Sequence, residues 1–158
     1  MATEMKFHAP AEMVARIGTE IGLSDWVAIT QDMVDRFADL TDDHQFIHTD
    51  PALAAKTPFG GTIVHGFLLL SMITTLLRSA DFVLQGVVMG VNYGFDRVRM
   101  VSPVRAGRRI RGRFTLKGLE ERTPGQWLCT VGIVLEIEGE SKPAVIADWL
   151  GLQFVRAD

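Results

Sequence analysis

The chain is poor in several features that would place it in a specialised class of protein. It has 158 residues and a single cysteine, Cys129, so no disulfide can form within it, which fits a reducing compartment. No apolar run reaches the ~20 residues that a membrane-spanning helix needs. Residues 1–13 lack the apolar core of a signal peptide. We therefore expect a cytoplasmic protein that does not associate with a membrane.

An overall excess of positive charge is also missing. The formal net charge is −3, which gives no indication of nucleic-acid binding. No spacing of histidine and cysteine indicates a metal site, and neither a Walker motif nor a dinucleotide fingerprint is present. We therefore expect no metal and no cofactor. Hydrophobic residues make up 47% and charged residues 22%, as in ordinary globular proteins, and we expect one domain over residues 1–158.

The most apolar stretch is Ile63–Leu77, with the sequence IVHGFLLLSMITTLL. From Phe67 onward this stretch is apolar on nearly every side, which predicts a buried helix. A helix of roughly 14 residues is about 21 Å long. The rest of the chain must supply the elements that cover it.

Short helices are expected before this stretch and strands after it. The expected helices are Ala11–Ile17, Gln31–Leu40 with Thr30 as N-cap, and a short helix from Pro51 to Lys56 with Asp50 as N-cap; Trp26–Ile29 reads as a strand and Thr41–Asp50 as a loop. The expected strands are Gly86–Val101, Arg108–Leu119, Trp127–Ile137 and Ala144–Val155.

Short connections between strands indicate antiparallel pairs. The prediction is an α+β fold in which a curved antiparallel sheet wraps around the central helix. Its exposed edges favour a homodimer.

The loop before the central helix concentrates polar chemistry. Asp43 and His48 lie five residues apart and can converge on one small volume. A carboxylate beside an imidazole can hold and polarise a water molecule. At the start of the helix, Gly66 leaves a backbone N–H free to bind an oxygen that becomes enolate-like. The alternatives are a solvated loop whose aspartates form turns and caps, and a His65–Gly66 pair that serves packing alone.

A longer run containing these residues resembles a known family. The run FADLTDDHQFIHTDPALAAKTPFGGTIVHGFLLLSM is similar to the signature of MaoC-like (R)-specific enoyl-CoA hydratases, which have the hot-dog fold. Gln45-Phe46 stands where many members have Asn-Pro, and the DHQ-aromatic-Ile-His version resembles the nodulation-protein-N-like subgroup. The resemblance covers about residues 30–110. It implies reversible addition of water to a trans-2-enoyl-CoA, giving a (3R)-hydroxyacyl-CoA, without a cofactor.

The resemblance also implies roles for individual residues. Asp43 and His48 would hold the water, and the Gly66 N–H would stabilise the enolate. The residues expected near the substrate are Gln45, His65, Ser71 and Asn92. Two other functions remain open, namely an acyl-CoA thioesterase and a non-catalytic acyl-CoA-binding protein of the same fold.

Three further features have two readings each. Nine of the sixteen Lys and Arg residues lie in Arg97–Arg122, either as a solvated strand face or as a site for coenzyme A phosphates. Asn92 and Tyr93 either contact substrate or form ordinary cross-strand pairs. Cys129 lies on an apolar strand face, which favours a core thiol over a nucleophile.

Overall fold

The computed structural model describes residues 7–156, so the first six residues of the segment 1–13, which lacks the apolar core of a signal peptide, lie outside the described residues. Its strands form one antiparallel sheet in the order β1-β4-β5-β6-β3, with β2 paired to β4. The strands are β1 (Glu20–Leu23), β2 (Val27–Ala28), β3 (Val87–Met100), β4 (Arg109–Thr123), β5 (Gln126–Ile137) and β6 (Val145–Val155). The four long strands correspond to the four expected from the sequence.

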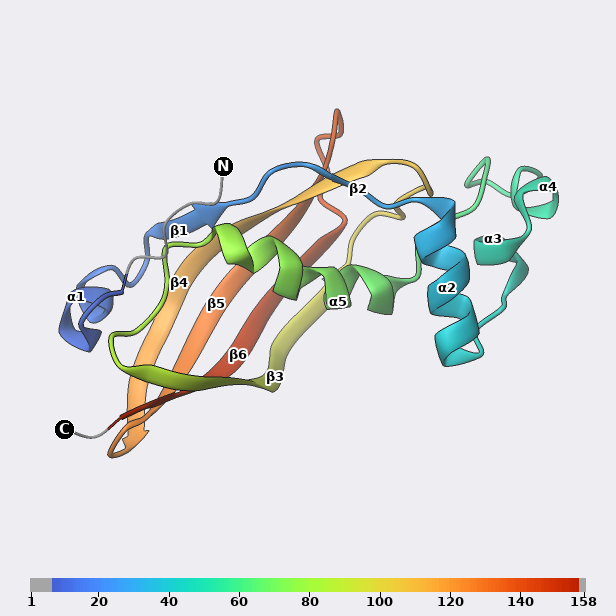
Figure 1. The fold of residues 1–158 in the computed structure, drawn as a ribbon. Helices are drawn as coiled ribbons and strands as arrows, with labels where there is room; N and C mark the ends of the chain where they lie inside the picture. Colours follow the sequence, from blue (N-terminus) through green and yellow to red (C-terminus); the bar gives the residue numbers. More distant parts are fainter. Residues whose placement is uncertain (1–6, 157–158) are drawn as a thin grey trace.

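The helix α5 (Gly66–Leu76) lies across the concave face of this sheet (Figure 1). It buries one side in the core, with Leu68, Leu69, Ile73 and Leu76 each less than 10% exposed. The sheet curves around that side and does not close, so Phe67 is 74% exposed. The α+β prediction with a sheet curved around a central apolar helix is confirmed, and it is the arrangement of the hot-dog fold.

The alternation of side chains explains how the sheet faces the helix. In β5, Cys129, Val131, Ile133, Leu135 and Ile137 are all buried, as the period of two predicts. β4 buries its apolar residues on the same side and presents arginines on the other. The alternation in the sequence therefore determines which face of the sheet is apolar and packs against α5.

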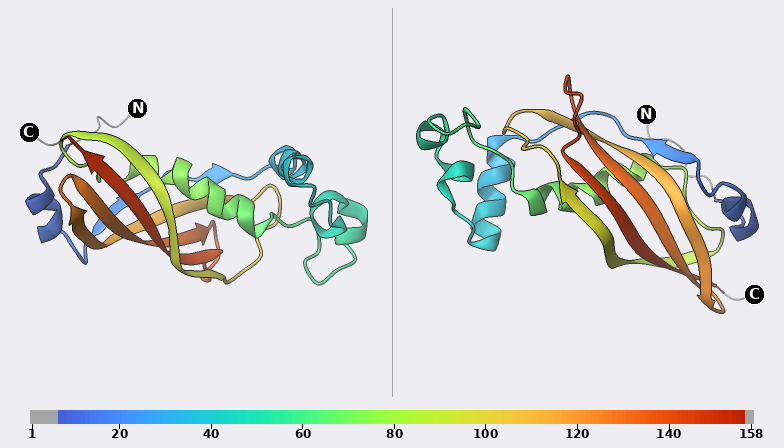
Figure 2. Two further views of the ribbon diagram at one scale, coloured as in Figure 1. Left: turned by 90° about the horizontal axis from the view of Figure 1, so that it is seen from below. Right: turned by 180° about the vertical axis from the view of Figure 1, so that it is seen from behind.

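The remaining helices gather at the two ends of the sheet (Figures 1 and 2). They are α1 (Pro10–Ala15) at one end, α2 (Gln31–Thr41), α3 (Phe46–Thr49) and α4 (Pro51–Ala54) at the other, and the 3₁₀ turn η1 (Leu77–Ser79) after α5. The predicted caps are confirmed, since Thr30 accepts from the Met33 N–H and Asp50 from the Leu53 N–H. This places α2–α4 beside the first turn of α5.

Three local predictions differ from the structure. The central helix begins at Gly66 and not at Ile63, because Ile63 forms a β-bridge with Arg105 and the Val64 N–H donates to the Val104 carbonyl. The stretch 41–50, expected to be a loop, contains the helical turn α3. Strand β1 was not expected at all. Each of these segments is too short for a hydrophobic period to reveal it.

The arginines of β4 face acidic partners across the sheet. Arg109 pairs with Glu138, and both Arg111 and Arg113 pair with Glu136. Although burial alone raises the pKa of Glu136, the hydrogen bonds from the two arginines hold it below its usual value. These contacts support the solvated-face reading of this part of Arg97–Arg122. Among the described residues, no helix is long and apolar enough to cross a membrane.

Candidate active site

The end of α2 positions Asp43. Asp42 takes a left-handed conformation, with φ of 58°, and its N–H closes the helix on the Ala38 carbonyl. Aspartate is one of the few residues besides glycine that adopts this conformation at low cost. The chain therefore turns sharply, and the Asp43 side chain stays 53% exposed to solvent.

His48 lies in the helical turn α3 and is 7% exposed. Its Nδ1 lies 2.7 Å from the carbonyl oxygen of Ile63, and an oxygen of this kind only accepts, so Nδ1 carries the proton. Its Nε2 is then unprotonated in the neutral ring and can act as a base. The Ile63 N–H also donates to the Ile47 carbonyl at 2.9 Å, which ties α3 to the segment before α5.

His65 lies beneath these two residues. Only 2% of it is exposed, and its ring stacks on that of His48 with 3.8 Å between centroids. Its Nε2 donates to the backbone oxygen of Asp43 at 3.0 Å, while Nδ1 is buried without a partner among the described residues. This position favours a role in holding Asp43 and His48 over the direct substrate contact expected from the sequence.

Gly66 is the first residue of α5 and follows directly on this cluster. The N-cap residue His65 makes no side-chain hydrogen bond to the first turn, which leaves backbone N–H donors at the positive end of the helix. A Cβ at position 66 would lie 3.1 Å from Met100 Cε, so glycine also permits the end of β3 to approach. The structure is therefore compatible with a Gly66 N–H that binds a substrate oxygen and also with a glycine that serves packing alone.

The remaining predicted residues divide into two groups. Ser71 and Asn92 both line a groove of about 480 Å³ along α5, here called the proximal groove, which begins at Phe67 beside Gly66. The Ser71 hydroxyl donates to the Phe67 carbonyl within the helix, and Asn92 Oδ1 accepts from the indole N–H of Trp149. Gln45 precedes α3, and its side chain is exposed at the surface of the loop.

Asp43, His48 and His65 can each bring one ligating atom within 4.8 Å of the others. Such distances are also those of a cation site, which the sequence does not indicate. His65 Nε2 carries a proton because it donates to the Asp43 carbonyl, so this nitrogen is not available as a metal ligand. The cluster instead presents a carboxylate and an unprotonated imidazole nitrogen to one small volume beside free backbone donors. That arrangement can polarise water and transfer protons.

Gln31 is a site residue that sequence reasoning missed. Its amide nitrogen donates to the His48 carbonyl at 2.8 Å and to Asp35 Oδ1 at 2.7 Å. Its amide oxygen accepts from the hydroxyl of Thr62, which is 7% exposed. Gln31 therefore links α2 to α3 and to the segment before α5. In the sequence it reads only as the first residue of a helix, and no spacing signals its partners.

Cys129 is buried on the core face of β5 and is not part of this cluster. Burial raises the pKa of its thiol to about 12, so little thiolate exists at neutral pH. The structure supports the core-thiol reading.

Comparison with known proteins identifies the family. A model described as "MaoC like domain" matches residues 12–135. The chain is 46% identical to Nodulation protein N of Rhizobium leguminosarum bv. viciae, over 89% of this chain and 88% of that protein. It is 43% identical to 3-hydroxyacyl-thioester dehydratase Z of Mycobacterium tuberculosis, over 90% of this chain and 93% of that protein. The solved structure of an (R)-hydratase from A. caviae involved in PHA biosynthesis superposes with a TM-score of 0.70 at 25% identity, over 85% and 94% of the two chains.

These relatives agree with the expectations drawn from the sequence. The hot-dog fold is confirmed by the superposition. The prediction of a hydro-lyase is confirmed, because the related proteins include a named 3-hydroxyacyl-thioester dehydratase and a named (R)-hydratase. The chain belongs to the MaoC-like dehydratase family.

Proposed function

We propose that this protein catalyses the reversible hydration of a trans-2-enoyl-CoA to a (3R)-hydroxyacyl-CoA. The observation that carries the proposal is the convergence of Asp43, His48 and the first turn of α5. A carboxylate and an imidazole lie within 4.8 Å of each other beside unoccupied backbone donors at Gly66. The names of the related (R)-hydratase and thioester dehydratase support this substrate class.

The proposed reaction uses each group once. The thioester oxygen accepts a hydrogen bond from the Gly66 N–H, which draws electrons from the double bond. Asp43 and His48 hold a water molecule, whose hydroxyl bonds to the β-carbon as one O–H bond breaks. The proton that the water loses passes to the Asp43–His48 pair and from that pair to the α-carbon. The pair is thereby restored, and the enolate returns to a thioester. Positioned acid–base groups of this kind accelerate reactions by about 10²–10⁴.

The test follows the conjugated enoyl absorbance of crotonyl-CoA and, in parallel, the release of free thiol. We expect loss of absorbance without thiol release. Asp43→Asn and His48→Ala should each lower kcat by about 10²–10⁴ while circular dichroism stays unchanged. Thiol release with the conjugated enoyl group intact would instead identify a thioesterase, and binding without either change would identify a non-catalytic protein.

The role of the Gly66 N–H can be tested by a matched pair of variants. Proline at the first helical position removes the N–H and is tolerated there, and the ψ of 136° at His65 suits a residue that precedes proline. Gly66→Ala places a similar carbon against Met100 but retains the donor. We expect Gly66→Pro to lower kcat by about 10²–10³ relative to Gly66→Ala. Equal rates in the two variants would remove the N–H from the mechanism.

We further propose that the protein is a homodimer that pairs through β3. This strand is one edge of the sheet, and Val88 and Tyr93 are each 61% exposed on it. An unpaired, apolar edge strand is a template for pairing with another chain. Sedimentation should give a dimer for the natural chain, and Tyr93→Lys should shift it toward a monomer. A cytoplasmic location also remains a proposal, which cell fractionation would test.

A further inference from the structure

Two hollows lie one after the other between α5 and the sheet. The proximal groove follows α5 from Phe67 to Thr74. A second hollow of about 310 Å³, here called the distal pocket, is lined beyond it by Leu77 and Phe82 among others. Three residues line both hollows, and they are Thr74, Asn92 and Trp149. These three therefore stand at the boundary between the two.

Trp149 is held firmly at this boundary. Its indole N–H donates to Asn92 Oδ1 at 2.6 Å, across the pairing of β6 with β3. Its ring stacks near that of Phe95, with 6.4 Å between centroids and an angle of 26° between the planes. A large ring fixed on two sides cannot turn aside without losing these contacts. The indole thus closes the far end of the proximal groove.

The distal pocket is poorly suited to a plain hydrocarbon. Gln153 lines it, and the side-chain oxygen Oε1 is buried without a hydrogen-bond partner among the described residues. An alkyl chain that filled the pocket has no donor for this oxygen and would leave it unsatisfied, whereas a ligand with a polar group could pair with it. The buried oxygen of Gln153 and the indole of Trp149 therefore both disfavour an acyl chain that extends beyond the proximal groove.

We propose that Trp149 determines the acyl chain length that this enzyme accepts. This inference rests on the proposed function, because it places the thioester at Gly66 and the acyl chain along the proximal groove. The groove from Phe67 to Thr74 extends about 10 Å along the helix axis, given a rise of 1.5 Å per residue. The acyl chain ends at the indole, so the substrates are short- and medium-chain thioesters.

The test compares kcat/KM for crotonyl-CoA, 2-octenoyl-CoA and 2-hexadecenoyl-CoA. The natural protein should use 2-hexadecenoyl-CoA at least tenfold less well than 2-octenoyl-CoA. Trp149→Ala joins the two hollows and should raise the ratio of 2-hexadecenoyl-CoA to 2-octenoyl-CoA at least tenfold. Adding Gln153→Leu should raise it further. Trp149→Leu offers the same comparison if the alanine variant does not fold.

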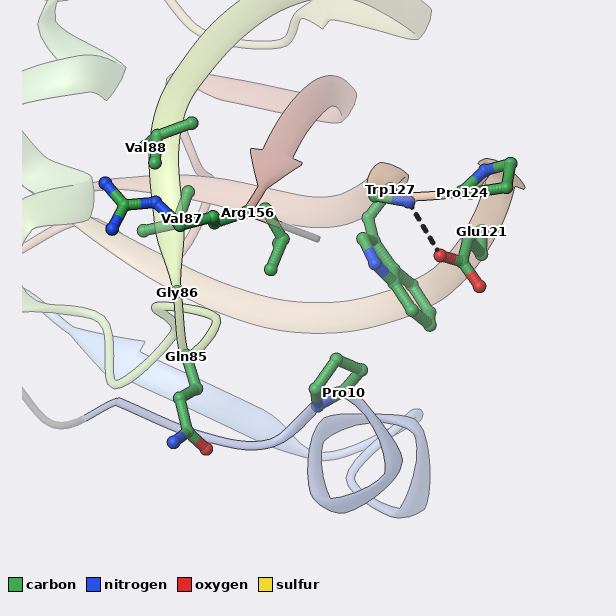
Figure 3. A pocket seen from close by; sticks show the side chains of 11 residues that line it. Pro10, Gln85, Gly86, Val87, Val88, Glu121, Pro124, Trp127 and Arg156 are labelled. Carbon is green, nitrogen blue, oxygen red and sulfur yellow. Dashed lines mark hydrogen bonds between the residues drawn. The ribbon is translucent and has the colours of Figure 1, made fainter. Parts of the chain in front are cut away.

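The matched control is Trp127→Ala. Trp127 is also a partly exposed tryptophan, but it lines a separate groove of about 840 Å³ with Pro10 and Arg156 at the α1 end of the molecule (Figure 3). Removing it changes a similar volume without touching either hollow, so the ratio should stay as in the natural protein. The inference is overturned if the ratio is the same in Trp149→Ala as in the natural protein, or if Trp127→Ala raises it equally.

A binding measurement separates this inference from the proposed function. Calorimetry with the saturated thioesters octanoyl-CoA and palmitoyl-CoA needs no catalysis. If no enoyl-CoA is hydrated but the Trp149 variant gains affinity for palmitoyl-CoA at least tenfold, the proposed reaction fails while the boundary stands. If hydration occurs and the Trp149 variant changes neither ratio nor affinity, the boundary fails while the reaction stands.

Discussion

Removing the side chain of Gln31 should weaken both the stability and the activity of the protein. This residue joins three elements, through hydrogen bonds to the His48 carbonyl, to the Thr62 hydroxyl and to Asp35. The first two hold the segment that carries the proposed base. The variant Gln31→Ala keeps the helical start, because alanine is a good helix former.

The size of the effect follows from the burial of the partners. Thr62 is 7% exposed, so its hydroxyl loses an acceptor that water cannot easily replace. A buried polar group left unpaired costs about 1–3 kcal/mol, and an ordinary hydrogen bond contributes about 0.5–1.5 kcal/mol. The bond to Asp35 is exposed and adds little. We therefore expect a loss of about 2–3 kcal/mol, which lowers Tm by about 4–12 °C for a chain of this size.

The effect on catalysis follows from the bond to His48. Without the amide of Gln31, α3 can shift, and misplacement of a reacting group by about 1 Å can cost a factor of about 10². We expect kcat to fall by about tenfold or more, with KM little changed, in the crotonyl-CoA assay at a temperature where the variant is folded. Asp35→Ala is the control, since it removes only the exposed bond and should leave both Tm and kcat nearly unchanged. A folded Gln31→Ala variant with the natural kcat would refute the positioning role.

Two further predictions concern groups outside the site. Cys129 should resist thiol reagents at pH 8 in the folded protein and react rapidly in denaturant, because burial raises its pKa to about 12; stoichiometric labelling of the native protein would contradict its burial. His8 bonds to Asp81 and to Glu12, and these bonds raise its pKa above the usual 6.5. Its contribution to stability should be full below pH 6.5 and lost as the pH rises through the folded-state pKa. Since His8 also lowers the pKa of Asp81, protonation of Asp81 removes the pair in acid. The Tm difference between the natural protein and His8→Gln should therefore peak between about pH 4 and 6.5, and a flat difference would contradict this linkage.

The long elements could be predicted from the sequence because each has a repeated physical signal. The alternation of buried residues over Trp127–Ile137 and the unbroken apolarity after Phe67 each extend over several turns or pairs. The short segments could not be predicted in this way. Ile63 and Val64 continue the apolar run of the helix, yet they pair with the segment at Val104 and Arg105. That contact lies about forty residues away in the chain, and no local propensity encodes it.

The candidate site also contains some residues that the sequence indicates and others that only the tertiary fold reveals. Asp43 and His48 could be named because a carboxylate and an imidazole in one short loop can share a water molecule, and because the run around them resembles the family signature. His65 was named for direct substrate contact, which stays a prediction, and the fold adds that its buried ring donates to the Asp43 carbonyl. Gln31 was missed because no spacing in the sequence signals its hydrogen-bond partners. Only the tertiary fold shows that its two amide atoms reach α3 and Thr62.

The unbroken apolarity of α5 needs an explanation, because only one side of the helix is buried. A one-sided helix needs an apolar stripe on that side alone, and a polar outer face would be more soluble. Here Phe67 is exposed, and together with Leu70 it lines the proximal groove that begins beside Gly66. The outer face thus has its own requirement under the proposed function, which is to hold an acyl chain next to the thioester. Ser71 and Thr74 satisfy this requirement as well, since each hydroxyl donates to a carbonyl of its own helix and exposes little polarity to the groove. The helix is therefore apolar all round because one side packs into the core and another lines the groove proposed for the substrate.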